Sequence, residues 1–442
     1  MSNDLNSIPG PAPKFLIGNA LDFVGTPSHV RLYEYGLAYG DIMRFWLFNQ
    51  ASILINEPAL IEQVLVIDRD LYYKNAPRKA AEPVMGDSLF LSNGKDWEFK
   101  RRNHPFSATE INNYFEKILP IIQKETNSYL QALQLSSTPK SVELFGELVQ
   151  LSFRIFSLTV LGTARNGGYF DAFKMLMQEM NNRGGQAFLP YPLSLNPMFW
   201  RSRQKWNNFI EELIYQRQQQ LDQRGIDLLS FVIQGTELST TQLRNELSTT
   251  FTAGTRNVAE VVAAVLFLCT KTPEVMQKLQ SEILEFLVES NRKFNLTNIN
   301  QLTYLDLVIK EALRLYPAVP LFIREVLPGE AVTLGEYRIP ENTQIFISSW
   351  AFHRNPKHWQ NPNAFLPERF ASPPPPFHYF PFGAGPRQCI GMAFTLVCTK
   401  VMLITILSQY ELELEIGTTF DTQYFSGTIA PQQGFRVKLK QK

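Results

Sequence analysis

Cys389 has the sequence surroundings of a reactive thiolate. It stands between glycines in the stretch FGAGPRQCIGMAF, directly before an apolar segment that we expect to form a helix from about Met392 to Ser408. Glycines let backbone N–H groups approach the sulfur closely, and the N-terminus of a helix stabilises negative charge. A thiolate in this position is a candidate metal ligand, whereas the ordinary interpretation of a lone cysteine is a packed apolar residue in a tight turn.

A second segment with unusual residues is TFTAGTRNVAEVVAAVLFL, residues 250–268, whose apolar side predicts a buried helix. Gly254 interrupts it, although glycine in a helix interior costs about 1 kcal/mol relative to alanine. Arg256 and Asn257 then place a permanent cation beside an amide. These residues raise the question of why a buried helix carries a weak point, a permanent cation and an amide side by side.

The chain around these two segments reads as mainly helical. The segment YLDLVIKEALRLYP, residues 304–317, carries apolar residues at i, i+3 and i+4 and predicts a half-buried helix that Pro317 ends. Another helix is predicted from Thr272 to Ser290, with Thr272 as its cap and Pro273 in its first turn.

Strands are predicted to be few. In AVTLGEYRIPENTQIFISS, residues 331–349, apolar and polar residues alternate on either side of Gly335 and Glu336, which predicts a small hairpin and a further strand. The segment from Asn355 to Pro386 is rich in proline and irregular, and its aromatic residues argue against disorder. The fold class that follows is mainly α with small β-sheets.

Composition sets limits on the class of protein. At 442 residues, with 45% hydrophobic residues and neither an internal repeat nor a long linker, we expect one domain over residues 1–442. The 42 basic and 41 acidic residues leave a net charge of +1, so there is no bulk field to attract nucleic acid or an anionic membrane. Three cysteines are too few for a disulfide framework and fit a reducing compartment.

The N-terminal residues predict neither a membrane span nor a signal peptide. They lack the apolar run of about 20 residues that a spanning helix needs, and the basic start and apolar core of a secretory signal. Residues 1–13 are expected to form an extended proline-rich lead-in. We therefore expect a soluble, cytoplasmic and monomeric protein.

The cysteine stretch resembles that of the cytochrome P450 haem-thiolate enzymes. The FxxGxRxCxG signature of that family is matched at each of its fixed positions, Phe382, Gly385, Arg387, Cys389 and Gly391. The resemblance runs from about residue 9 to the end of the chain. It implies the P450 fold, with haem b held between the long central helix and the cysteine loop.

Other marks of the family occur in the expected order. Trp97 and Arg101 match its WxxxR pair, Glu311 and Arg314 match its ExxR pair, and Arg369 matches the arginine of its PERF motif. The last three residues are implied to form a buried ion triad that holds the irregular stretch against the helix. Since a buried charge without a partner is strongly destabilising, loss of one member should reduce haem incorporation.

The resemblance implies roles for residues around the cofactor. Cys389 would be the axial ligand of the iron. Cations at Arg101, Arg324 and Arg387 would bind the two haem propionates, because arginine can grip a carboxylate with two hydrogen bonds. Trp97 would either donate its indole N–H to a propionate or simply pack. The remaining cofactor-binding residues implied are those of the cysteine loop, Phe382, Gly385 and Gly391.

The central helix departs from the family pattern, which is Ala/Gly, Gly, any residue, Asp/Glu, Thr. The matching residues are Ala253, Gly254, Thr255, Arg256 and Asn257. Gly254 is expected to let the helix bend and admit a ligand over the haem. The acid and the threonine that carry protons during oxygen activation in the family are replaced, because Arg256 cannot release a proton at neutral pH and Asn257 is no acid.

Three interpretations of this departure are open. In the first, Arg256 pairs with Glu260 one turn later and faces away from the haem, while Asn257 holds a water that relays protons. In the second, Arg256 clamps a substrate carboxylate, as in the fatty-acid peroxygenases of the family, although those carry proline at the next position. In the third, Asn257 resembles the asparagine of members that rearrange fatty-acid hydroperoxides, whose cysteine loops often carry an insertion that is missing here.

The activity implied is that of a monooxygenase that hydroxylates or epoxidises a small lipophilic molecule such as a fatty acid or terpenoid. In the absence of a flavin-binding domain, electrons are expected from separate partners such as a ferredoxin and its reductase. A peroxide-driven peroxygenase or a hydroperoxide-rearranging enzyme is one alternative, and a haem-binding sensor or carrier is another. Residues 70–92 and 170–215 are expected to contribute to the pocket, with Phe90, Phe188 and Phe199 as candidates.

Overall fold

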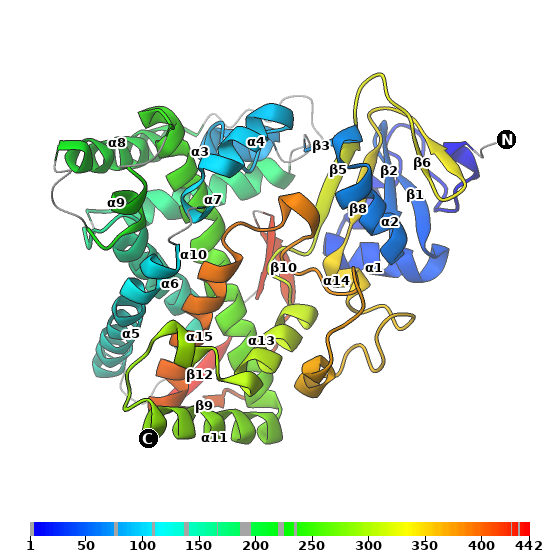
Figure 1. Cartoon of the computed structure of the whole chain (residues 1–442). Coiled ribbons are helices and arrows are strands. Elements are labelled where there is room, and N and C mark those ends of the chain that lie inside the picture. The colour runs from blue at the N-terminus through cyan, green and yellow to red at the C-terminus, as the bar shows by residue number, and fades with distance from the viewer. Residues whose placement is uncertain are drawn as a thin grey trace.

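The structure is a computed structural model that describes residues 4–74, 78–107, 111–136, 141–165, 167–185, 196–219, 225–233, 237–425, 427–431 and 434–442. Helices make up most of it (Figure 1). The α-helices are α1 (Ser28–Tyr39), α2 (Pro58–Glu62), α3 (Arg78–Met85), α4 (Gly94–Asn103), α5 (Ile111–Ser136), α6 (Leu144–Val160), α7 (Tyr169–Gly185), α8 (Pro197–Gln219), α9 (Leu228–Val232), α10 (Thr240–Lys271), α11 (Pro273–Glu289), α12 (Leu296–Ile299), α13 (Thr303–Leu315), α14 (Ser349–Phe352) and α15 (Met392–Gln409).

The strands form small sheets. The strands are β1 (Ile42–Leu47), β2 (Gln50–Ile55), β3 (Tyr72–Tyr73), β4 (Val142–Glu143), β5 (Phe322–Val326), β6 (Val332–Leu334), β7 (Tyr337–Ile339), β8 (Gln344–Ile347), β9 (Tyr410–Leu414), β10 (Thr422–Phe425), β11 (Thr428–Pro431) and β12 (Arg436–Gln441). The largest sheet has the order β1-β2-β8-β5-β3, in which β2 and β8 are parallel and the other pairs antiparallel. It lies on the N-terminal side of the molecule together with α1, α2 and α14, and most of the other helices lie on the other side (Figure 1).

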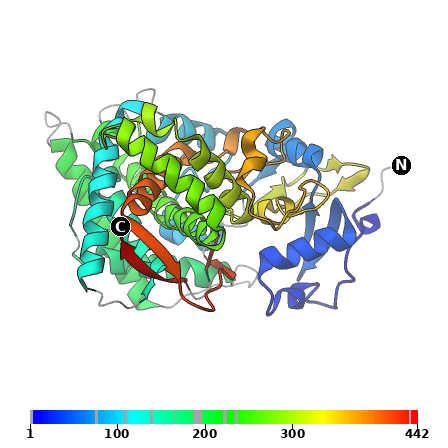
Figure 2. The ribbon, with the colours of Figure 1, turned by 90° about the horizontal axis from the view of Figure 1, so that it is seen from below.

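Helix α10 runs through the middle of the helical region, where α6, α8, α13 and α15 pack against it (Figure 1). It begins with a capping box formed by Ser239 and Gln242, and it ends before Pro273. From Val258 to Cys269 every residue of α10 is buried, because this part of the helix lies inside the largest hydrophobic cluster. A second cluster lies around the five-stranded sheet. The N-terminal lobe that contains this sheet projects to one side when the molecule is seen from below (Figure 2).

Most of the elements expected from the sequence are confirmed. The fold is mainly α with small sheets, α13 and α15 lie where predicted, and the hairpin of β6 and β7 turns at Gly335 and Glu336. Two expectations were wrong in detail. Thr272 is the N-cap residue of α11, but its side chain makes no capping hydrogen bond. Within residues 1–13, Leu5–Ser7 form a 3-10 turn that Asp4 caps, so the extended lead-in is shorter than predicted.

Two helices, α10 and α15, are long and apolar enough to cross a membrane by length and composition alone. In the most apolar window of α10, 78% of the residues are buried inside the protein, and in that of α15, 72% are buried. A core helix passes the same test. Both helices are core helices here.

Candidate functional site

The cysteine loop is held in place by its own backbone. The N–H of Cys389 donates to the carbonyl of Phe382 at 2.9 Å, which closes the loop before α15 begins. Gly385 has a φ of 69°, and a Cβ there would meet the backbone carbonyl oxygen of Leu65. Only glycine adopts that conformation without strain and also permits the contact. Gly391 is the N-cap residue of α15 and lies directly after the loop.

The Cys389 thiol is exposed, unlike the other two cysteines, although protein surrounds the loop. Burial raises the pKa of the thiol, while the backbone N–H of Gly391 and the charges of Arg101 and Lys74 act to lower it. Burial is the larger influence. The pKa of the free thiol is therefore shifted upward, and a bound metal cation would favour the thiolate.

Two of the predicted cations lie beside the loop. Arg101, on α4, donates from Nη1 to the carbonyl of Gln388 at 3.0 Å. Arg387 donates from Nη1 to the carbonyl of Ser92 at 3.0 Å, and its guanidinium lies over the Trp97 ring at 4.6 Å from the centroid. Trp97 thus packs against Arg387 in this structure.

Two more cations complete the group. Arg324, on β5, is 9% exposed, and burial together with Arg387 lowers its pKa to about 10. Lys74 was not predicted from the sequence. Its ammonium lies 3.6 Å from the centroid of the Phe90 ring, and burial, followed by the charges of Arg324 and Arg387, holds its pKa well below the usual value.

Within the described part of the chain, no carboxylate forms an ion pair with Lys74, Arg101, Arg324 or Arg387. Cations taken out of water without a partner are costly. The arrangement is therefore suited to an anion that the described residues do not supply. Two propionates beside a metal ligand fit these charges, so the residues present fit haem. Lys74 had no sequence signal, because a single lysine is far more common as a solvated surface residue.

On α10, the motif positions lie where most of the surrounding helix is buried. Ala253, Gly254, Arg256 and Asn257 are each partly exposed, whereas Thr255 and the residues on both sides are buried. Positions i and i+4 share one side of a helix, so Ala253 and Asn257 face the same way. The Oδ1 atom of Asn257 is buried and accepts no hydrogen bond from the described residues.

Gly254 has a packing role that the sequence did not indicate. The helix is continuous from Thr240 to Lys271, and a Cβ at position 254 would collide with the ring of Phe156 on α6. Gly254 is needed because α6 and α10 pack closely, which is a different use of glycine from a bend that admits a ligand.

Arg256 is engaged within its own helix. Its Nε donates to Oε1 of Glu260 at 2.9 Å, and its guanidinium lies 5.1 Å from the centroid of the Phe145 ring at the start of α6. This is the i, i+4 pairing of the first interpretation. A substrate carboxylate would have to compete with Glu260 for the cation.

Glu311 lies at the centre of a buried polar network. Its carboxylate binds Arg314 Nε at 2.7 Å and Arg369 Nε at 2.9 Å, and it accepts the backbone N–H of Leu366 at 3.0 Å. Arg314 also donates from Nη2 to Glu311 Oε1 at 2.9 Å, and its other N–H groups bind the carbonyl of His353 and, in the irregular stretch, those of Pro362 and Ala364. Glu311 and Arg314 are both 0% exposed, yet both are fully partnered. The network ties α13 to the chain that leads into the cysteine loop.

The pocket candidates lie in different environments. Phe90 is 38% exposed and lies under Lys74. Phe199 is fully buried and packs against Trp200, so it does not line an open space here. Phe188 lies outside the described residues. Cys269 and Cys398 are buried, and burial raises the pKa of Cys269 to about 12.

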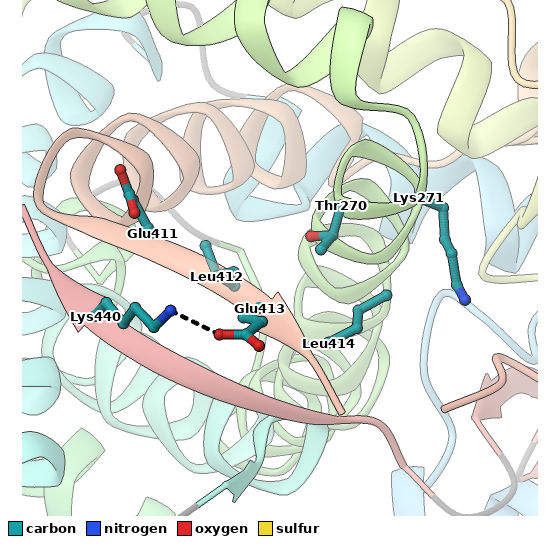
Figure 3. Close-up of a pocket in the computed structure, with 7 residues that line it drawn as sticks. All are labelled: Thr270, Lys271, Glu411, Leu412, Glu413, Leu414 and Lys440. Atoms are coloured by element: carbon teal, nitrogen blue, oxygen red, sulfur yellow. Dashed lines mark ion pairs between the residues drawn. The ribbon is translucent and has the colours of Figure 1, made fainter. Parts of the chain in front are cut away.

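Two surface hollows of about 470 Å³ each occur in the described structure. One, at the end of α10, is bordered by β9 and β12 and contains the Glu413–Lys440 ion pair (Figure 3). It contains none of the predicted site residues. The other contains Trp97 and Arg101 and is also lined by Arg69, Glu98, Arg102 and Ser107.

Comparison with known proteins agrees with the geometry. The sequence matches the family model described as Cytochrome P450 over residues 8–439. Cytochrome P450 4d8 of Drosophila melanogaster is 27% identical over 92% of this chain and 96% of its own. Cytochrome P450 4V2 of Mus musculus is 26% identical over 99% and 90%, and the chloroplastic protein LUTEIN DEFICIENT 5 of Arabidopsis thaliana is 25% identical over 93% and 74%. The chain belongs to the cytochrome P450 family, and it is a monooxygenase that binds haem.

Proposed function

We propose that the thiolate of Cys389 would bind the haem iron and that Lys74, Arg101, Arg324 and Arg387 would receive the propionates. The observation that carries this assignment is the group of cations beside an exposed thiol, none of them paired with a carboxylate among the described residues. When bound, the haem supplies the oxidising chemistry, in which O2 and two electrons insert one oxygen atom into a substrate.

The protein's own contribution is to orient and to exclude water. The carbonyl of Phe382 fixes the backbone of Cys389, and the N–H of Gly391 points its hydrogen bond at the sulfur. Such hydrogen bonds tune a metal-bound thiolate. The Glu311 network fixes the approach of the loop, because it binds the irregular stretch at several carbonyls.

The substrate is a small lipophilic molecule such as a terpenoid or a fatty acid. The side of α10 that carries Ala253 and Asn257 offers one methyl group and one amide, and Phe90 offers an exposed ring. Such surfaces favour apolar ligands and discriminate weakly between molecules that differ by a methylene.

Electrons come from separate partners of the ferredoxin type. This is supported by the hollow beside Trp97, which is lined by Arg69, Arg101 and Arg102 against a single acid, Glu98. A basic hollow next to the propionate-binding residues suits an acidic electron carrier. We place the protein in a reducing compartment, the cytoplasm, which the three free cysteines support.

The test is a paired product assay on the haem-loaded protein with fatty acids and terpenoids. One arm receives O2, a ferredoxin, its reductase and a nicotinamide cofactor, and the other receives hydrogen peroxide alone. We expect product in the electron-fed arm, with Arg256→Ala still active there. Cys389→Ser should abolish product in both arms, and Cys398→Ser serves as the matched control.

Other outcomes would support the alternatives. Efficient fatty-acid turnover in the peroxide arm alone, lost in Arg256→Ala, would make Arg256 a carboxylate clamp and the protein a peroxygenase. A haem that reduces and binds carbon monoxide, but yields no product with either oxidant, would favour a sensor or carrier.

A further inference from the structure

The motif on α10 has no acid at position 256, yet the helix carries one a turn later. Glu260 is at i+4 from Arg256 and i+3 from Asn257, so it is a helix-surface neighbour of both residues. It is 4% exposed. A carboxyl group in the apolar middle of a core helix is costly, and no packing need explains it.

The contacts of Glu260 leave one of its oxygens without a partner. Oε1 accepts from Arg256 Nε at 2.9 Å and from the hydroxyl of Thr428, on β11, at 2.8 Å. Oε2 is buried and accepts no hydrogen bond from the described residues, and the same is true of Oδ1 of Asn257. Two neighbouring acceptors without a donor are satisfied if a proton resides on the carboxyl and a water bridges to the amide.

The surroundings of Glu260 also determine the pH at which its carboxyl ionises. Burial raises the pKa of Glu260 to about 8, against the opposing effects of Arg256 and the Thr428 hydroxyl. These two groups, on α10 and β11, are the charged and polar partners that face it. An acid whose pKa lies close to the working pH can both release and regain a proton.

We propose that Glu260 is the proton-relay residue of this enzyme and does the work of the acid that position 256 lacks. This inference rests on the proposed function. Glu260 releases its proton to a water held by Asn257, and the carboxylate that remains is stabilised by Arg256 and Thr428. It regains a proton by way of the Thr428 hydroxyl, which donates to Oε1 at 2.8 Å.

The reactions with O2 and with hydrogen peroxide differ in whether they consume protons. With oxygen, substrate RH, O2, two electrons and two protons give ROH and water, and the electrons come from the separate donor. With hydrogen peroxide, RH and H2O2 give ROH and water, and no added proton is needed. A relay residue is therefore required in the first reaction and dispensable in the second.

The deciding variant is Glu260→Gln, which keeps an oxygen that can accept from Arg256 and Thr428 but cannot carry a proton. We expect oxygen-driven product to fall on the order of 10²-fold, with the electrons appearing as hydrogen peroxide, while peroxide-driven product stays near the wild-type level. Glu246→Gln is the matched control, because Glu246 is another carboxyl on α10 and is 1% exposed. It should keep the oxygen-driven reaction.

An infrared measurement, which needs no catalytic turnover, detects the proton on Glu260 directly. Infrared spectra of the haem-loaded protein should show a carboxylic-acid C=O component that disappears between pH 7 and pH 9 in the wild type, is missing in Glu260→Gln and is kept in Glu246→Gln. If Glu260→Gln fails to take up haem, Glu260→Asp serves instead and should shift the band and retain oxygen-driven product.

Failure of the inference and failure of the proposed function look different. The inference would be overturned if Glu260→Gln matched the wild type both in oxygen-driven product and in the share of electrons that end in product. Equal losses of product in the oxygen and peroxide arms would also overturn it. If the wild type itself gives no product, the proposed function fails, and the infrared comparison decides the protonation of Glu260 alone. A spectrum unchanged by Glu260→Gln would then overturn the relay, and loss of the titrating band would support it.

Discussion

Replacing Glu311 by glutamine should destabilise the protein strongly, because this carboxylate neutralises two arginines at once. It binds Arg314 at 2.7 Å and Arg369 at 2.9 Å. Arg314 is completely buried, so it cannot turn to water when the charge is removed. The amide of glutamine keeps one acceptor but directs an NH2 group at a cation.

The magnitude follows from the burial. Breaking a buried ion pair by removing one partner costs about 3–5 kcal/mol, because an uncompensated charge stays inside the protein. Since the same network binds the segment leading to the cysteine loop, haem retention should fall together with stability. Urea titration followed by backbone circular dichroism and by haem absorbance measures both quantities in one experiment.

Glu368→Ala provides the matched control from the same PERF motif. Glu368 pairs with Lys278 at 2.7 Å, but the two side chains are 50% and 60% exposed. An exposed pair of this kind contributes about 0–1 kcal/mol. If Glu311→Gln shifts the unfolding midpoint no more than Glu368→Ala does, the triad of Glu311, Arg314 and Arg369 does not stabilise the fold as we infer from its geometry.

Three further predictions follow from the packing and the charges. Gly254→Val should destabilise the protein by about 1–3 kcal/mol through overpacking against Phe156, and in a double-mutant cycle Gly254→Val and Phe156→Ala together should cost less than the sum of their separate costs. Lys74→Met should weaken haem retention in a competition with apomyoglobin, whereas Lys95→Met, at an exposed position, should not. Burial raises the pKa of Glu246 from 4.5 to about 7. Between these two pH values the folded protein holds a proton on Glu246 that the unfolded chain releases. The free energy of unfolding of the wild type therefore falls as pH rises from about 4.5 to about 7. Glu246→Gln should therefore gain stability relative to wild type as pH rises from 5 to 8. A difference in the free energy of unfolding between variant and wild type that does not change with pH would contradict this assignment.

The sequence was sufficient for the parts of the site that are fixed by backbone geometry. The spacing around Cys389 predicted a tight loop before a helix, and the stripe on α13 placed Glu311 and Arg314 one turn apart. It was insufficient where the outcome depended on contacts between distant segments. Gly254 looked like a flexible point because Phe156 is remote in sequence, and nothing near Lys74 indicated that it lies among other cations.

The cations around Cys389 and the cation on α10 differ in what they contact. Around Cys389 the cations have no carboxylate partner among the described residues, so that side attracts an anion. On α10 the guanidinium of Arg256 already donates a hydrogen bond to Glu260, whose carboxyl holds a proton in our proposal. A fatty-acid carboxylate bound there must displace Glu260 from its cation, which costs part of its binding energy, whereas a neutral lipophilic molecule pays no such penalty. The same pair that supplies a proton therefore favours uncharged substrates, and it weakens the case for a carboxylate-clamping peroxygenase.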